Sequence, residues 1–340
     1  MLLVRTLLPL ILSALVVLPA QGKESKDAMP APAGFPPAVC PAPPPPAAAP
    51  AHHSANAQSY RPFPEAWQAV LDGVVRNDKV PGVVVIVKSP SWGVRVGTAG
   101  VANRISGTPI SPDMQFRVGS VTKLALAQVI LQMEQEGRLR LTDPVLKHLG
   151  DNALVRGIPH VGEITVGDLL QMKSGLPNYL GASDMFFSPQ VTPHRHFSVD
   201  DLVRPLSTAG GAEPLPPDFL PGQTYPNPYW QTLYKSQPPA PAPYPYWFYS
   251  NSNYLLLGMI AEKVSGLKAD DVMRKYIADR GGLTDTYLAT DERNLPHIHG
   301  YAKWGAISYP QPVFDDWCDM TAINPSIAWT AGALVSTPDR

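Results

Sequence analysis

The first patterned part of the chain has apolar residues at helical spacing. Between residues 64 and 78 they recur three or four positions apart, at Trp67, Val70, Leu71, Val74 and Val75. This spacing is typical of an amphipathic helix. Two Val-rich runs follow at residues 82–88 and 93–97, joined by a Ser-Pro-Ser turn, and they predict two strands. The simplest assembly is a helix packed on an antiparallel sheet.

Two later segments are apolar on most sides. Residues 124–136 carry a polar stripe of Gln128, Gln132 and Gln135, and Gly137 ends the segment. A helix that is apolar on most faces is a buried one, so this segment predicts a buried central helix. Residues 253–266 contain a second apolar run that ends in Gly266, and they predict another helix with a glycine terminator.

Composition divides the chain into parts. The 27 Lys+Arg and 28 Asp+Glu residues leave a net charge of -1, which argues against a nucleic-acid partner because phosphate binding needs a basic excess. Of the 40 prolines, ten lie between residues 30 and 50 and fourteen lie between residues 189 and 245. An ordinary globular protein is therefore predicted to carry one Pro-rich linker and one Pro-rich insertion, the latter at about residues 185–247.

The N-terminus has the pattern of an export signal. A basic start at Met1 to Arg5 precedes an uncharged Leu-rich and Val-rich run with small residues near position 22. This run is shorter than the roughly 20 residues of a membrane span, and prolines interrupt it. We therefore expect a signal peptide at residues 1–22, a Pro/Ala-rich linker at 23–62 and a folded domain at 63–340. The expected location is secreted or periplasmic, without a stable membrane span once the signal is removed.

The candidate chemistry begins at Ser120 and Lys123, which stand at the predicted start of the central helix. Lys123 is expected one turn after Ser120 on the same face. A neutral lysine can take the proton of a serine hydroxyl when burial lowers the lysine pKa, and the N–H groups at a helix N-terminus favour an oxyanion. The geometry suits acyl transfer. A second match, Ser265 to Lys268, straddles Gly266 at a helix end and is interpreted as a decoy.

A second candidate pair is Tyr249 and Asn251, which precede the helix predicted over 253–266. Residues two apart in an extended turn point the same way. One of them can then donate or relay a proton while the other hydrogen-bonds an amide carbonyl. Tyr225-Pro226-Asn227 has the same spacing, but its proline and the lack of a following helix make it the poorer candidate.

Several spaced motifs together resemble those of serine hydrolases of the penicillin-recognising superfamily. They are Ser120-x-x-Lys123, Leu169-Leu170 with Ser174-Gly175-Leu176, Pro221-Gly222, Tyr249-Ser250-Asn251, and the run from Ala331 to Thr337. The closest likeness is to D-alanyl-D-alanine carboxypeptidases, class C β-lactamases and related esterases. The resemblance spans about residues 64–340.

The resemblance implies a fold and a role for each candidate. The expected fold is α/β, with a mixed, mainly antiparallel sheet flanked by helices and a largely helical subdomain at about residues 141–288. Ser120 would be acylated, Lys123 would act as base or relay, Tyr249 would shuttle protons, and Asn251 would hold the substrate amide. Whether Lys123 or Tyr249 is the base stays open. No cofactor or metal is implied, and the partner is a small-molecule or peptide substrate.

The sequence also departs from the family pattern. The third motif, a His or Lys followed by a small residue and Gly, should follow the run from Ala331 to Thr337, but this sequence ends at Arg340. The sequence is therefore expected to be a fragment lacking C-terminal strands and a second oxyanion donor, with an inactive truncated product as the alternative. Met172 occupies the place of a family histidine. The aromatic insertion before Tyr249 is read equally as a lid or substrate wall and as a surface excursion.

Other polar features receive simpler interpretations. His194 with His196 and His297 with His299 have a spacing that metal sites use, but no carboxylate or thiolate completes a ligand set. The cluster of Asp315, Asp316 and Asp319 is interpreted as a solvated turn. A disulfide between Cys40 and Cys318 is possible in an oxidising compartment, but a flexible linker gives it no defined geometry, so the sequence does not favour it.

Taken together, the sequence predicts an exported serine hydrolase that acts on D-Ala-D-Ala peptides or β-lactams. An esterase on the same fold and a catalytically impaired wall-associated binding protein are the alternatives. A Pro-rich adaptor, with a partner for Pro43 to Pro46, is a further class.

Overall fold

A computed structural model gives the fold. It describes residues 60–77, 80–182, 193–211, 213–215, 247–290, 296–302 and 318–338. The predicted signal peptide, nearly all of the predicted linker and residues 216–246 of the predicted insertion lie outside the described residues. Within those ranges, no helix has the length and apolar character needed to cross a bilayer.

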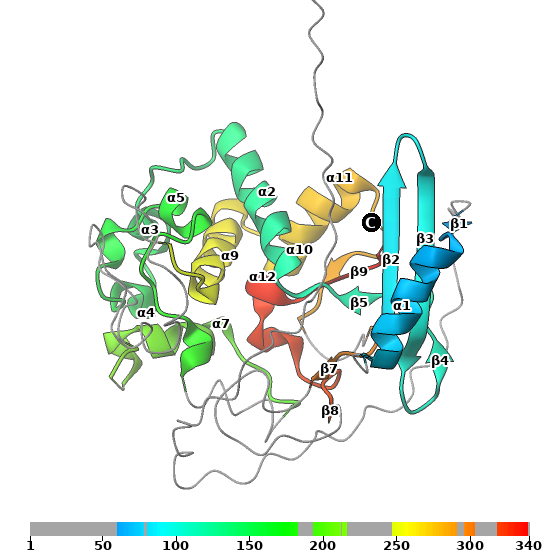
Figure 1. Ribbon diagram of the computed structural model, residues 1–340. Coiled ribbons are helices and arrows are strands. Elements are labelled where there is room, and N and C mark those ends of the chain that lie inside the picture. The colour runs from blue at the N-terminus through cyan, green and yellow to red at the C-terminus, as the bar shows by residue number, and fades with distance from the viewer. Residues whose placement is uncertain are drawn as a thin grey trace, which may run out of the picture.

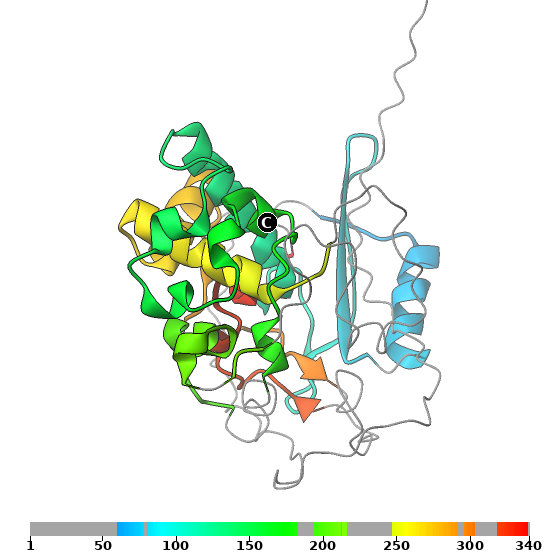
Figure 2. The ribbon, with the colours of Figure 1, turned by 90° about the vertical axis from the view of Figure 1, so that its left-hand side faces the viewer.

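The N-terminal part is a helix on a sheet, as predicted. Helix α1 (Glu65–Asn77) packs on a hairpin of β2 (Gly82–Ser89) and β3 (Gly93–Asn103), which pair in antiparallel fashion. Two short strands, β1 (Arg61–Pro62) and β4 (Thr108–Pro109), also pair with β3. Figures 1 and 2 show α1 on the face of this sheet that points away from the helical part of the molecule.

The helical part contains the two predicted apolar helices, α2 and α9. Shorter helices and turns surround them (Figure 2). The helices are α2 (Thr122–Gln135), α3 (Val145–Leu149), α4 (Ala153–Arg156), α5 (Val166–Leu170), α7 (Val199–Val203), α9 (Asn251–Ser265), α10 (Ala269–Met273), α11 (Asp279–Gly281) and α12 (Trp329–Gly332). The 3-10 turns are η1 (Gly119–Val121), η2 (Val161–Glu163), η3 (Tyr179–Gly181), η4 (Arg204–Leu206), η5 (Thr208–Gly210) and η7 (Pro325–Ile327), and a π-helical turn, η6 (Arg274–Ala278), joins α10 to α11.

A small antiparallel sheet lies beside the helical part. Its order is β5 (Phe116–Arg117), β9 (Leu334–Ser336) and β6 (Tyr287–Leu288). A separate ribbon pairs β7 (Tyr301–Ala302) with β8 (Cys318–Asp319). The fold is thus α/β with mainly antiparallel strands and a largely helical part, which confirms the expected fold class.

The main hydrophobic core lies around α9. Ten consecutive residues of this helix, from Ser252 to Ala261, are buried. Helices α2, α3, α5, α10 and α12 all pack against it. Gly258 lets α12 approach closely, because a Cβ at this position would lie 2.2 Å from Thr330 Oγ1. The core therefore fixes the relative positions of α2, α9 and α12.

The surroundings of α2 correct one expectation. Its inner face is buried through Leu126, Val129, Ile130 and Met133, whereas Leu124 is 73% exposed and Leu131 is 49% exposed. The described residues therefore leave open a mixed face of the helix, where Leu124 and Leu131 alternate with exposed Gln128 and Gln135. Ser120 is also exposed, in the turn η1 that precedes α2, and is not buried at the helix N-terminus.

Two predictions for the region after residue 296, on the environment of Asp319 and on a disulfide at Cys318, are also corrected. Asp319 does not lie in a solvated turn: it is 8% exposed in β8, and its Oδ2 lies 2.6 Å from His299 Nδ1. The pairing partner was hard to foresee because the two residues are brought together by the β7–β8 ribbon. Cys318 is buried and disulfide-bonded, although the sequence did not favour a bond. Asp315, Asp316 and Cys40 lie outside the described residues.

Candidate active site

Ser120 lies at the junction between the small sheet and α2. Strand β5 leads into Gly119, whose φ of 55° lies in the left-handed region that glycine adopts without strain. The first residue of α2 holds the turn, since Thr122 Oγ1 donates to Gly119 O at 2.6 Å and accepts from Leu334 N at 3.0 Å. Ser120 is thus presented to solvent from a fixed backbone.

Lys123 points back toward Ser120 from the first turn of α2. Its residue exposure is 5%, and its Nζ lies 3.2 Å from Ser120 Oγ. The same Nζ donates to Asn251 Oδ1 at 2.7 Å and to the Ala331 carbonyl at 2.6 Å. The lysine therefore joins α2 to α9 and α12 at the position where its amine meets the serine.

Burial changes the acidity of this lysine. Desolvation by the surrounding protein lowers the pKa of Lys123 from 10.5 to about 8. Burial disfavours the charged form of an amine, which explains the direction. With a pKa of about 8, roughly a tenth of the molecules carry a neutral Lys123 at pH 7, compared with fewer than about one in a thousand for an ordinary lysine.

Tyr249 approaches the serine from the other side. Its hydroxyl lies 2.6 Å from Ser120 Oγ, and its ring centroid lies 4.9 Å from Lys123 Nζ. The preceding backbone is anchored where Phe248 N donates to Met172 O at 3.2 Å. Tyr249 is 38% exposed, so this contact with the nucleophile lies at a side chain that solvent reaches.

Asn251 begins α9 and bridges two neighbours. Its Oδ1 accepts from Lys123 Nζ, and its Nδ2 donates to Asn178 Oδ1 at 3.3 Å. Ser250 caps the helix, because its side chain accepts from Ser252 N at 3.3 Å. The structure therefore brings all four predicted residues, Ser120, Lys123, Tyr249 and Asn251, into one connected hydrogen-bonded group.

The loop over residues 174–179 supports this group. Ser174 Oγ donates to Asn253 Oδ1 at 2.6 Å, and Ser252 Oγ donates to Pro177 O at 2.6 Å. Met172, just before the loop, is buried with a φ of 58°, a left-handed conformation that is costly outside glycine and clusters at functional sites. The loop that contains Ser174-Gly175-Leu176 is thus joined by hydrogen bonds to the first turn of α9 and fixes its position.

Known proteins share this sequence and this fold. The profile of the family described as Beta-lactamase matches residues 67–340. The chain belongs to this family. Penicillin-binding protein 4* of Bacillus subtilis (strain 168) is 27% identical over 203 residues, which are 60% of this chain and 37% of that protein. Esterase EstB of Burkholderia gladioli is 30% identical over 161 residues, which are 45% of this chain and 39% of that esterase.

Solved structures of the beta-lactamase fold agree with this one. A D-stereospecific amidohydrolase from Streptomyces sp. has a TM-score of 0.60 and 29% identity, covering 81% of this chain and 69% of its own. The D-amino acid amidase from Ochrobactrum anthropi SV3, complexed with L-phenylalanine, has a TM-score of 0.59 and 25% identity. The match covers 81% of this chain and 68% of the amidase chain. The protein is therefore a member of a serine hydrolase superfamily that includes penicillin-binding proteins, esterases and amidases. The chain spans well under two thirds of the length of the curated relatives just named.

The remaining sequence candidates do not join the site. Ser265 Oγ donates to the Ala261 carbonyl within its own helix at 2.6 Å, while Lys268 precedes α10, so this second Ser-x-x-Lys match forms no pair. Tyr225-Pro226-Asn227 lies outside the described residues. No group of three or more metal-ligating side chains occurs within the described ranges. His299 is instead bonded to Asp319, and its Nε2 lies 3.1 Å from Asn103 Nδ2.

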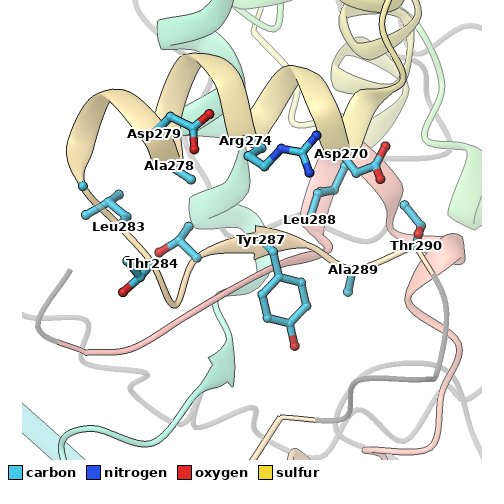
Figure 3. Close-up of a pocket in the computed structure, with 12 residues that line it drawn as sticks. Asp270, Arg274, Ala278, Asp279, Leu283, Thr284, Tyr287, Leu288, Ala289 and Thr290 are labelled. Carbon is cyan, nitrogen blue, oxygen red and sulfur yellow. The ribbon is translucent and has the colours of Figure 1, made fainter. Parts of the chain in front are cut away.

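A separate cavity of about 850 Å³ lies between β6 and the helices α10 and α11. Figure 3 shows Arg274 and Asp270 on the helical side and the Tyr287 ring extending from the strand. None of the four predicted site residues lines it.

Sequence reasoning missed three supporting groups. Asn178 contacts Asn251, Met172 anchors Phe248, and the Ala331 carbonyl accepts from Lys123. Asn178 lies two residues after Leu176 of the Ser-Gly-Leu motif, which was a usable signal. Every residue has a backbone carbonyl, so no side-chain pattern could have indicated the contact between Lys123 and the Ala331 carbonyl.

Proposed function

We propose that this protein is an exported serine hydrolase that forms an acyl-enzyme on Ser120. The observation that carries the proposal is the environment of Lys123 Nζ. Asn251 Oδ1 and the Ala331 carbonyl can only accept, so they take both N–H bonds of a neutral amine. The third contact of the nitrogen, Ser120 Oγ at 3.2 Å, then faces its lone pair.

The first step follows from this arrangement. The Ser120 hydroxyl proton moves to the neutral amine of Lys123, and Oγ attacks the substrate carbonyl carbon to give a tetrahedral oxyanion. The backbone N–H groups at the start of the η1–α2 segment favour that negative charge. This assigns Lys123 as the base, with burial supplying the neutral fraction.

Tyr249 is proposed as the proton carrier for the leaving group. Its hydroxyl already contacts Ser120 Oγ, which is bonded to the tetrahedral carbon. Collapse of the intermediate breaks the bond between that carbon and the leaving nitrogen or oxygen, close to the Tyr249 hydroxyl. The hydroxyl gives its proton to the leaving group and is reprotonated from the Lys123 ammonium. In the second half-reaction the same groups take a proton from a water molecule as its oxygen attacks the acyl carbon. They give a proton to Ser120 Oγ as the bond between that carbon and Oγ breaks, which releases the acid. Asn251 Nδ2 is proposed to hold the substrate amide.

The proposed substrates are amides and peptides with a D-configured residue, such as D-Ala-D-Ala peptides, and β-lactams. The likeness to a D-stereospecific amidohydrolase and to a penicillin-binding protein supports this class. An esterase is the second candidate, supported by the likeness to Esterase EstB. Export to the periplasm or the medium is proposed on the N-terminal sequence pattern.

Covalent labelling tests the proposal. Incubation with a fluorophosphonate and, separately, with a fluorescent penicillin should add one label, and peptide mass spectrometry should locate it on Ser120. Ser120→Ala should abolish labelling, whereas Ser265→Ala, the matched control from the second Ser-x-x-Lys match, should leave it unchanged. Labelling by the fluorophosphonate alone favours the esterase. If neither reagent labels the wild-type protein, the proposal is wrong, and the alternative of a catalytically impaired binding protein is favoured.

A further inference from the structure

The orientation of the Asn251 side chain depends on a residue that contacts neither Ser120 nor Lys123 in the structure. Asn178 Oδ1 accepts from Asn251 Nδ2 at 3.3 Å and also from Leu180 N at 3.3 Å. We propose that Asn178 is a positioning residue that fixes the Asn251 amide with its oxygen toward Lys123. This inference rests on the acyl-transfer function proposed above.

The donor and acceptor inventory determines the orientation. An amide side chain has one accepting oxygen and one donating nitrogen. If the Asn251 amide were reversed, its NH2 would face the Lys123 amine and its oxygen would face Asn178 Oδ1. The second contact would place two acceptors together, which is unfavourable. Asn178 cannot turn to relieve it without giving up the bond from Leu180 N.

The backbone on both sides of Asn178 is tied to α9, which carries Asn251. On one side, Ser252 Oγ donates to the Pro177 carbonyl. On the other side, Tyr179 N donates to Ser252 Oγ at 3.0 Å. Tyr179 is 1% exposed, and its hydroxyl donates to the Ile327 carbonyl at 2.6 Å. Burial raises the pKa of Tyr179, so it remains a donor. Asn178 is therefore held at a fixed place relative to Asn251.

The orientation matters for the amine of Lys123. With the Asn251 oxygen facing it, a neutral amine uses an N–H on Asn251 and keeps its lone pair for Ser120. A reversed Asn251 would donate to that lone pair and draw it away from the serine, and it would also repel the ammonium form. The titratable groups that face this amine are Tyr249, with its ring centroid at 4.9 Å, and Tyr254 of α9, at 5.8 Å.

Two substitutions at one position separate positioning from structural support. Asn178→Ser keeps a residue that caps η3 but is too short to reach Asn251. It should slow acylation by about 10- to 100-fold and move the Lys123 titration to lower pH. Asn178→Asp keeps both the cap and the acceptor and adds a negative charge near the amine. It should raise the Lys123 titration by about one pH unit and retain most of the acylation rate on the plateau above that pKa, with a lower rate near pH 7 because less of the amine is neutral.

The readouts are the pH profile of acylation and the ¹³C NMR titration of the Lys123 side chain. The matched control is Asn152→Ser, at an asparagine that caps α4 through Val155 N; it should change neither readout. Shifts of opposite sign for the two Asn178 variants support the inference. Wild-type acylation and an unchanged titration in both variants would overturn it. Because the titration needs no turnover, failure of the wild-type protein to acylate would count against the proposed function and leave the test of Asn178 intact.

Discussion

The helical part and the N-terminal sheet are packed very differently. Helix α9 has ten consecutive buried residues, whereas α1 buries only Leu71 and none of the eight residues of β2 is fully buried. All four predicted site residues come from the helical part or the segments that lead into it. The candidate site thus lies where α2, α9 and α12 pack together. The sheet with α1 is less tightly packed.

This contrast explains how a lysine can be held away from water. In place of water, the Lys123 amine donates hydrogen bonds to Asn251 Oδ1 of α9 and to the Ala331 carbonyl of α12. The packing of these helices keeps both acceptors in place. A lysine on the sheet meets no such surroundings, as shown by Lys88, which is exposed on β2. Position in the fold, more than residue type, therefore lowers the pKa of Lys123.

Removing the Lys123 amine should give the largest effect. Lys123→Met keeps a long apolar side chain but leaves no group to accept the Ser120 proton, so the acylation rate constant should fall by about 10²- to 10⁴-fold. Lys88→Met on β2 should leave acylation within about two-fold of wild type. Stopped-flow acylation with a chromogenic ester measures both. Equal losses in the two variants would contradict the difference drawn between the two regions.

Truncating a core side chain tests the packing itself. Leu256 of α9 is fully buried, so Leu256→Ala should lower the free energy of unfolding by about 2–5 kcal/mol. Val70 of α1 is 64% exposed, and Val70→Ala should change the free energy of unfolding by less than about 0.5 kcal/mol. Urea denaturation followed by circular dichroism compares them. Similar values would mean that the two regions are equally well packed.

Two helical glycines sharpen the same comparison with a smaller expected effect. An alanine Cβ at Gly258 would lie 2.2 Å from Thr330 Oγ1, so Gly258→Ala should destabilise the protein by about 1–3 kcal/mol and displace α12. At Gly73 of α1 the nearest atom is Asn77 Nδ2 at 3.8 Å, so Gly73→Ala should stabilise the protein by about 0.4–1 kcal/mol. Thermal unfolding gives both signs, and equal signs would refute the assignment.

Local patterns in the sequence predicted the longest helices, the first two long strands and four candidate residues that the structure brings together. The spacing of Trp67, Val70 and Leu71 predicted α1, which spans Glu65–Asn77, and the Val-rich run predicted β2. The four candidate residues were proposed because a nucleophile, a base and a relay each need a particular side chain next to a helix start, and because the order of the motifs resembles that of the family. The hydrogen bonds of Ser120, Lys123, Tyr249 and Asn251 form one group in the structure.

Contacts between distant segments were not accessible from such patterns. Asp319 was interpreted as solvated because its partner His299 reaches it only through the pairing of β7 with β8. The open face of α2 at Leu124 and Leu131 was missed for a similar reason, because an apolar pattern does not say which neighbours cover it. Asn178 was missed because its importance lies in the amide that it faces.

The central claim is that neutral Lys123 accepts the Ser120 proton. It is tested most directly by comparing two pH profiles on one protein: the ¹³C NMR titration of the Lys123 side chain and the rate constant for acylation of Ser120. Because the base must be deprotonated, acylation should rise about ten-fold per pH unit on the acid side and level off above the pKa of Lys123. Both curves should have their midpoint at a pH of about 8. A Lys123 titration near 10.5, with acylation already at its plateau at pH 7, would contradict the claim.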